Sequence, residues 1–142
     1  MGSELLVGIR CLKKLYEQES AWVCEKHGLS QLEVDIIAYL FNHPEQDTAR
    51  DIVELRMLPK ANVSQAVESM IGKGLLLREP DLHDRRRIHL KLTETARGAM
   101  ADIDASRARM RAVMLNGFST GEVRQYMRLE ERIIENLRDY LR

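Results

Sequence analysis

The chain has 142 residues, of which 44% are hydrophobic and 31% are charged, so it can form one folded domain or two small ones. Aromatic residues make up only 5%, which argues against carbohydrate binding and against single-strand binding on stacked aromatic platforms. The formal net charge is zero but unevenly spread. It is −4 over residues 1–47 (4 basic, 8 acidic), +3 over 48–97 (10 basic, 7 acidic) and +1 over 98–142 (8 basic, 7 acidic). The middle of the chain is therefore where anion binding is expected.

A membrane protein and a disulfide-stabilised secreted protein are both disfavoured. No run of 18 apolar residues occurs, and Arg10, Lys13 and Lys14 interrupt any apolar signal segment near the N-terminus. Cys11 and Cys24 lie about 20 Å apart along one predicted helix, so they cannot pair within it. We therefore expect a cytoplasmic protein without a membrane partner.

The first part of the chain reads as two helices. Apolar residues at helical spacing predict a helix over residues 4–26, with Gly28 as its C-terminal cap. Ser30 and Glu33 have the spacing of a capping box, which opens a second helix that ends near residue 42.

Two shorter helices are expected next. Thr48 is the predicted N-cap of the third helix. Pro59 suits the first turn of the fourth helix, which ends near Lys73 with Gly74 as its probable cap. The fourth helix has one apolar face, formed by Val63, Ala66, Val67, Met70 and Ile71.

After residue 74 the apolar period changes from 3.6 to 2, which predicts a β-hairpin. Its strands are residues 75–79 and 87–92, and a polar loop over residues 80–86 joins them. Thr93 is expected to cap a fifth helix that runs to Asn116. A capping box beginning at Ser119 then opens a final helix that reaches the C-terminus.

The predicted fold class is mainly α with a small β-hairpin, a winged helix-turn-helix with long N- and C-terminal dimerisation helices. Residues 30–93 would be the winged helix-turn-helix, and residues 94–116 a linking helix. Residues 1–29 and 117–142 would form a helical dimerisation region. The reason is that long amphipathic flanks exceed what so small a centre can cover, so two copies would pair their ends. A monomeric bundle is the alternative.

The fourth helix carries the first candidate site residues. Two helices joined by a short turn can place the second helix in the DNA major groove, with its N-terminal residues at base edges. Asn and Gln match the donor–acceptor pair of adenine, Lys suits guanine or phosphate, and Ser can bond to several edges. Any surface helix also has a solvated polar face, and that reading has about equal weight on this segment alone. The candidates are Lys60, Asn62, Ser64 and Gln65.

The hairpin loop carries the second set. Arg85, Arg86 and Arg87 are three adjacent like charges, which repel one another in a plain turn but suit a groove of negative potential. Asp84 precedes Arg86 by two residues, so we expect it to orient that guanidinium in a bidentate pair. A surface ion-pair cluster is the alternative.

These motifs resemble those of the MarR family of bacterial transcriptional regulators. The match comprises Gly28, Leu29 and Ser30 before the second helix, and Gly74, Leu75 and Leu76 after the fourth. In the wing it comprises Asp84 and Arg86, followed by Leu92 and Thr93. The resemblance spans about Leu5 to Leu141, with departures at Ala96 and at the pair Leu82 and His83.

The resemblance implies a winged-helix homodimer on a pseudo-palindromic operator, with Arg86 entering the minor groove. Many members are repressors that a small phenolic or lipophilic ligand releases. One branch has a peroxide-sensing cysteine in its first helix, but a buried, inert Cys11 is favoured here.

Other site hypotheses are weaker. An effector pocket could be lined by aromatic and methionine side chains, although core packing is the default reading of such residues. Cys24 and His27 could share a metal with His43 or Glu25, but no second ligand pair appears, so neither metal nor cofactor is expected. The pocket candidates are Trp22, Tyr39, Phe41, Met57 and Met70.

The sequence therefore predicts a sequence-specific regulator that binds double-stranded DNA, most simply a repressor. The alternative is a protein–protein interaction module that uses the winged helix without specific DNA binding. An enzyme is not expected, because no phosphate-binding glycine loop, nucleophile elbow or metal-binding helix motif is present. The operator, the regulated genes and any effector cannot be identified from the sequence.

Overall fold

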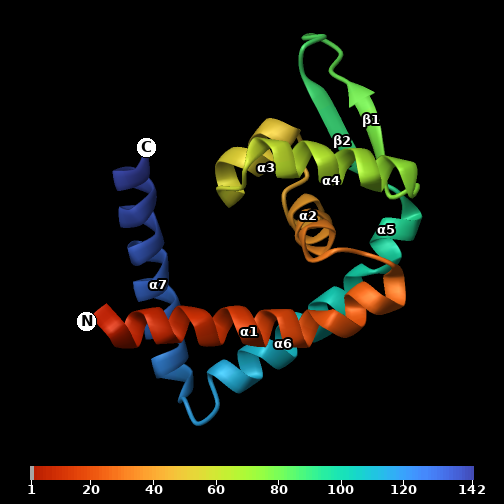
Figure 1. Cartoon of the computed structure of the whole chain (residues 1–142). Coiled ribbons are helices and arrows are strands. Elements are labelled where there is room, and N and C mark those ends of the chain that lie inside the picture. The colour runs from red at the N-terminus through yellow and green to blue at the C-terminus, as the bar shows by residue number, and fades with distance from the viewer. Residues whose placement is uncertain (1) are drawn as a thin grey trace. The chain divides into compact units, whose positions relative to one another are not determined.

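The computed structural model describes residues 2–142, which form seven helices and one two-stranded hairpin (Figure 1). The chain divides into two compact units, one ending at Ala108 and the other beginning at Arg109. None of the helices within residues 2–142 is long and apolar enough to span a bilayer. In chain order the elements are α1 Gly2–His27, α2 Gln31–Asn42, α3 Ala49–Arg56, α4 Lys60–Gly72, β1 Leu76–Pro80, β2 Ile88–Leu92, α5 Glu94–Gly98, α6 Met100–Met114 and α7 Thr120–Leu141.

The helix starts that the sequence predicts are confirmed. At α2 the Ser30 hydroxyl accepts the Glu33 amide N–H at 3.1 Å, and the Glu33 carboxylate accepts the Ser30 N–H at 2.9 Å. The same reciprocal pair forms at α3, between Thr48 and Asp51, and at α7, where Ser119 is the N-cap. Each box satisfies amide donors that have no partner inside the helix, so each fixes where its helix begins.

An ion pair between a buried carboxylate and a partly exposed lysine joins three helix ends. Glu33 is buried, and its carboxylate lies 2.7 Å from the Lys73 ammonium, which also donates to the Gly28 carbonyl at 3.0 Å. Burial raises the pKa of Glu33, but hydrogen bonds from Lys73 and Ser30 outweigh it and lower the pKa overall. The end of α1, the start of α2 and the end of α4 are thereby joined.

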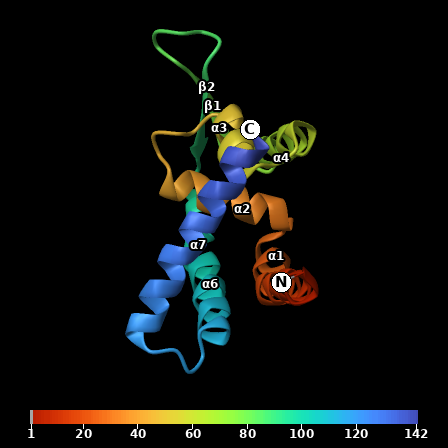
Figure 2. The ribbon, with the colours of Figure 1, turned by 90° about the vertical axis from the view of Figure 1, so that its left-hand side faces the viewer.

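Helix α2 is the centre of the first unit. It packs against α1, α4, β2 and α5, and both ribbon views place it between α1 and α4 (Figures 1 and 2). Every residue from Ile36 to Leu40 is buried. The largest fully buried side chains come from α2 itself and from five other elements: Tyr39, Ile36, Ile37, Ile52, Met70, Leu76, Ile103, Val23 and Val63.

The hairpin is antiparallel and begins at the end of α4. Leu76 pairs with Leu92 and Pro80 with Ile88, so both predicted strands are confirmed to within one residue. The Thr93 amide donates to the Leu75 carbonyl at 3.1 Å, which closes the base of the hairpin. The far end of the hairpin extends away from the helices (Figure 2).

Two local expectations are wrong. The predicted helix over 93–116 is two helices, α5 and α6, because the Ala99 amide bonds to the Ala96 and Arg97 carbonyls in a tight turn after Gly98. Pro59 is the N-cap of α4 rather than part of its first turn, since its ψ of 132° is extended. The buried face nevertheless continues across the break, through Ala96, Ala99, Met100 and Ile103.

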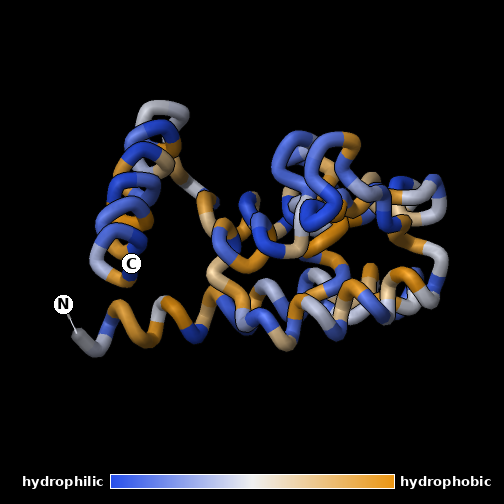
Figure 3. Tube along the Cα trace, turned by 90° about the horizontal axis from the view of Figure 1, so that it is seen from above, coloured by the Kyte–Doolittle hydropathy of each residue, from blue (hydrophilic) through white to orange (hydrophobic). Residues whose placement is uncertain are grey.

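The second unit consists mainly of α7, a strongly amphipathic helix. Its apolar residues recur at helical spacing between hydrophilic ones (Figure 3), yet none of its residues is buried. Exposed large apolar side chains also occupy the first half of α1, from Leu5 to Leu12. Two apolar helix faces are therefore exposed to solvent, whereas folded proteins normally bury such faces.

Adjacent leucines on β1 provide a matched test of this core. Leu76 is 0% exposed and Leu77 is 60% exposed. We expect Leu76→Ala to lower the free energy of unfolding by about 2–5 kcal/mol, because it leaves a cavity in the core. Leu77→Ala should change it by no more than ~0.5 kcal/mol.

Urea denaturation followed by circular dichroism, at one fixed protein concentration, measures both leucine variants. Equal losses for the two would contradict the strand register.

Candidate nucleic-acid interface

Helix α4 presents its predicted site residues to solvent. Lys60, Asn62, Ser64 and Gln65 are all exposed, whereas the buried residues of the helix are Val63, Ala66, Val67 and Met70. The packing of α3 against α4 sets this orientation, with a left-handed Met57 (φ 51°) in the turn between them. The polar face is therefore held outward on a rigid element, as base-edge recognition requires.

The wing loop is a hydrogen-bonded turn organised by two aspartates. One Asp81 carboxylate oxygen accepts the amide N–H groups of His83, at 3.0 Å, and Asp84, at 2.9 Å. Asp84 in turn accepts the Arg86 amide at 3.0 Å with its side chain and the Arg87 amide with its carbonyl. The loop that carries the three arginines thus has a defined backbone.

Asp84 contacts Arg86 differently from the prediction. The bidentate pair is wrong: only Nε of Arg86 approaches the carboxylate, at 3.4 Å, because the same oxygen also accepts the backbone amide. The Arg86 side chain is 93% exposed. Asp84 therefore fixes the backbone of Arg86 and leaves the tip of its guanidinium free to meet a ligand.

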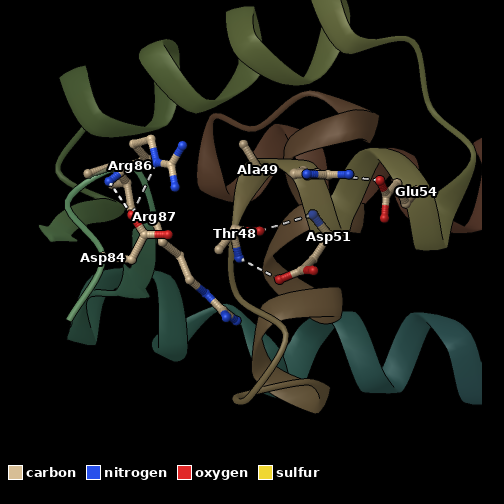
Figure 4. A pocket seen from close by; sticks show the side chains of 9 residues that line it. Thr48, Ala49, Asp51, Glu54, Asp84, Arg86 and Arg87 are labelled. Atoms are coloured by element: carbon tan, nitrogen blue, oxygen red, sulfur yellow. Dashed lines mark hydrogen bonds and ion pairs between the residues drawn. The ribbon is translucent and has the colours of Figure 1, made fainter. Parts of the chain in front are cut away.

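A cleft of about 820 Å³ separates the start of α3 from the wing (Figure 4). Three arginines line it, namely Arg50, Arg86 and Arg87, and three carboxylates balance them. Arg50 pairs with Glu54 at 2.9 Å, while the side chain of Arg87 forms no ion pair within the described residues. The remaining lining residues are Thr48, Ala49, Asp51, Asp84 and Ile88.

The base of the wing holds site residues that the sequence reasoning missed. The His89 ring lies between two carboxylates, with Nδ1 2.6 Å from Asp47 and Nε2 2.7 Å from Asp81. The hydrogen bond to Asp47, and then the one to Asp81, raise the pKa of His89. Burial raises the pKa of Asp47, but its hydrogen bonds with His89 and Lys91 outweigh burial and lower it. No sequence motif links Asp47 to His89, which lie 42 residues apart.

The residues predicted to line an effector pocket have different surroundings. Tyr39 and Met70 are fully packed in the core, and Tyr39 donates to the Gln46 carbonyl at 2.7 Å. Trp22 packs against the edge of the core, whereas Phe41 and Met57 are exposed. In this conformation Tyr39 and Met70 fill the core, as the default reading expected.

Cys11 and His27, considered above as a thiol and as a metal ligand, have surroundings that differ from those expected. Cys11 is exposed in the single chain, so the expectation of a buried thiol is wrong: residues 2–14 of α1 are all exposed. His27 Nε2 lies 2.8 Å from Asp102, so its ring binds a carboxylate on α6. No group of three or more metal-binding side chains gathers within residues 2–142.

The helix-turn-helix and the wing loop resemble those of a known protein family. The model of the MarR family matches residues 27–87, which run from the end of α1 to the wing loop and stop just before β2. The helix-turn-helix and wing loop of this chain are therefore similar to those of the MarR family. The predicted resemblance and the predicted fold class are therefore both confirmed.

Solved MarR-type structures share the fold over nearly the whole chain. A MarR protein from Peptoclostridium difficile has a TM-score of 0.86 at 16% identity, over 99% of this chain and 91% of that one. A MarR-family regulator from Listeria monocytogenes, complexed with a 26mer DNA, has a TM-score of 0.81 at 17% identity, over 98% and 89%. An organohalide-sensing regulator bound to 2,4-dichlorophenol has a TM-score of 0.74 at 18% identity, over 94% and 79%.

A substitution at Asp84 distinguishes two effects on DNA binding: that of its negative charge and that of its hydrogen bonds in the wing loop. Asp84→Ala adds one unit of positive charge, so charge alone would tighten DNA binding. We expect it instead to weaken binding by about 1 kcal/mol, because the Arg86 backbone loses its acceptor.

Arg86→Ala should weaken DNA binding by ~1–3 kcal/mol, because it removes the guanidinium that is expected to enter the minor groove. Lys13→Ala, on exposed α1, is the control, and fluorescence anisotropy on labelled duplex DNA is the measurement. Tighter binding by Asp84→Ala would show that the wing acts only through its charge.

Proposed function

We propose that this protein is a homodimeric transcriptional regulator that binds double-stranded DNA in a sequence-specific manner, most simply as a repressor in the cytoplasm. The observation that carries the proposal is the pairing of two exposed elements on one unit. Helix α4 turns Lys60, Asn62, Ser64 and Gln65 outward, and the wing beside it presents Arg85, Arg86 and Arg87. The fold that positions them is also the fold of the Listeria monocytogenes regulator complexed with DNA.

The two elements divide the work of recognition. Helix α4 would enter the major groove, where Asn62 and Gln65 can each make a bidentate contact with adenine. The wing would reach the neighbouring minor groove, whose negative potential attracts Arg86. Base-edge contacts from α4 would therefore determine sequence preference, while the arginines determine affinity and its dependence on salt.

Dimerisation supplies the second half-site. The apolar face of α7 is exposed from Met127 to Leu141, and arginines and glutamates flank it. A surface with both charge signs beside an apolar stripe suits pairing with an identical surface in the opposite direction. We infer that a second copy covers it, which would place two α4 helices on a pseudo-palindromic operator about one helical turn, ~34 Å, apart. The exposed apolar residues are Met127, Leu129, Ile133, Ile134, Leu137, Tyr140 and Leu141.

A small phenolic or lipophilic effector is part of the proposal. It is supported by the organohalide-sensing structural neighbour, which was solved with 2,4-dichlorophenol. Such a molecule would release DNA only by binding the DNA-incompetent dimer more tightly than the competent one. Tyr39 and Met70 would have to move to admit it, because both now fill the core.

The decisive experiment is fluorescence anisotropy with DNA taken from upstream of this protein's own coding region. We expect binding that resists random competitor DNA of equal length and weakens steeply as salt rises. Gln65→Ala should change the preferred sequence more than the overall affinity, because its contact is with a base edge. Weak binding to both DNAs at low salt would instead support the alternative, a winged helix that docks a protein partner.

The dimer is tested separately on α7. We expect Leu137→Asp to give a monomer in sedimentation velocity at micromolar concentration, because it places a carboxylate in the apolar contact. Arg132→Asp is the matched control: it lies five residues away, on the polar side of the helix, and should remain dimeric. A wild-type chain that sediments as a monomer would exclude the dimer.

A further inference from the structure

His89 occupies a singular position between the helix-turn-helix and the wing. It lies on β2, and its two ring nitrogens face carboxylates from two different loops. Nδ1 is 2.6 Å from Asp47, which directly precedes the N-cap of α3. Nε2 is 2.7 Å from Asp81, which directly follows β1 and opens the wing loop. One side chain thus bridges the two segments.

The geometry favours the charged form of the ring. A neutral imidazole has one N–H donor and one lone pair, and a lone pair facing a carboxylate oxygen is repelled by it. Both distances are those of charge-assisted hydrogen bonds, and only the imidazolium can donate from both nitrogens to two ionised carboxylates. The bridge is therefore complete only when His89 is an imidazolium.

The surrounding charges favour that form. Lys91 binds the second oxygen of Asp47 at 2.8 Å, so Asp47, Asp81, Lys91 and protonated His89 sum to zero, whereas neutral His89 leaves −1. Glu79 is opposite His89 in the register of the hairpin. Glu45 and His83 line the same small pocket as His89. The two glutamates add negative potential, and His83 is a second histidine beside the site, so its substitution serves as a control.

The bridge leads directly to the arginines. Asp81 uses its other oxygen to hold the amides of His83 and Asp84, and Asp84 then holds the amides of Arg86 and Arg87. At the other end, the Asp47 carbonyl accepts the Leu90 amide of β2 at 2.8 Å. A continuous set of hydrogen bonds therefore runs from the start of α3 to the wing arginines.

We propose that His89 is a positioning residue for DNA binding, whose imidazolium fastens the wing to the start of α3 and so sets where Arg86 and Arg87 meet the duplex. This inference rests on the proposed function. When His89 loses its proton, one of its two hydrogen bonds is lost and the wing turn is released. Binding must then also order that turn, which weakens it.

The direction of the pH dependence follows from the raised pKa of His89. The bridge is fully formed below the ordinary histidine pKa of 6.5 and is lost as the pH rises through the raised value. DNA binding should therefore weaken toward alkaline pH, over a range that begins above 6.5.

The test is the affinity for the upstream DNA, measured by anisotropy at constant ionic strength from about pH 6 to about pH 8.5, where histidine titrates. We expect the wild-type chain to lose at least about fivefold in affinity across this range. His89→Gln, which carries no positive charge to offset the two carboxylates, should bind weakly at every pH. His89→Arg, which is always charged, should bind tightly at every pH. His83→Gln, in the same wing, should keep the wild-type profile.

A second measurement separates this inference from the proposed function. The ¹⁵N chemical shifts of the His89 ring report whether both nitrogens carry protons, with or without DNA. If the ring titrates as expected but the affinity is equal for His89→Gln and wild type at pH near 6, the bridge does not position the arginines and the inference fails.

The other outcomes are equally distinct. If a neutral ring is found at that low pH, the bridge itself is refuted. If the wild-type chain fails to discriminate the upstream DNA at any pH, the proposed function fails, and with it the role of His89 in DNA binding. The ring shifts then still decide whether the bridge exists.

Discussion

The burial of α2 is the constraint on which the rest of the first unit depends. Its residues from Ile36 to Leu40 are enclosed by α1, α4, β2 and α5, so all four elements have their apolar sides turned toward one helix. Helix α4 packs against α2 with Val63, Ala66, Val67 and Met70 buried, so its polar residues face the solvent. The candidate recognition surface is thus a consequence of how the core is filled.

The wing is positioned by a different kind of force. Of its strand residues only Leu76 and Leu90 are buried, and beyond them the hairpin is held by directional polar contacts with Asp47 and Asp81. Apolar packing tolerates small displacements, whereas charge-assisted hydrogen bonds weaken with distance and angle. The molecule therefore combines a helix set by packing with a loop set by polar geometry, and only the second responds to protonation.

The sequence predicts what is decided locally. Capping boxes, the change of period at the hairpin and the glycines after helices are short-range signals, and the structure confirms them at Ser30, Thr48 and Gly74. Contacts between distant residues leave no such signal, which is why Glu33 with Lys73 and Asp47 with His89 were missed. The break at Ala99 was missed for another reason: the apolar spacing runs straight through it, while only the backbone hydrogen bonds change.

The charge balance of the cleft beside the wing has a kinetic consequence. Its three arginines face Asp51, Glu54 and Asp84 within a chain of zero formal net charge, so little long-range field draws the protein toward a phosphate backbone. Complexes with arbitrary DNA, which lack the close contacts of a matched site, would then form slowly and dissociate quickly. A regulator built this way would search a genome mainly by dissociating and rebinding rather than by long sliding, and its residence on a site would depend on close-range fit.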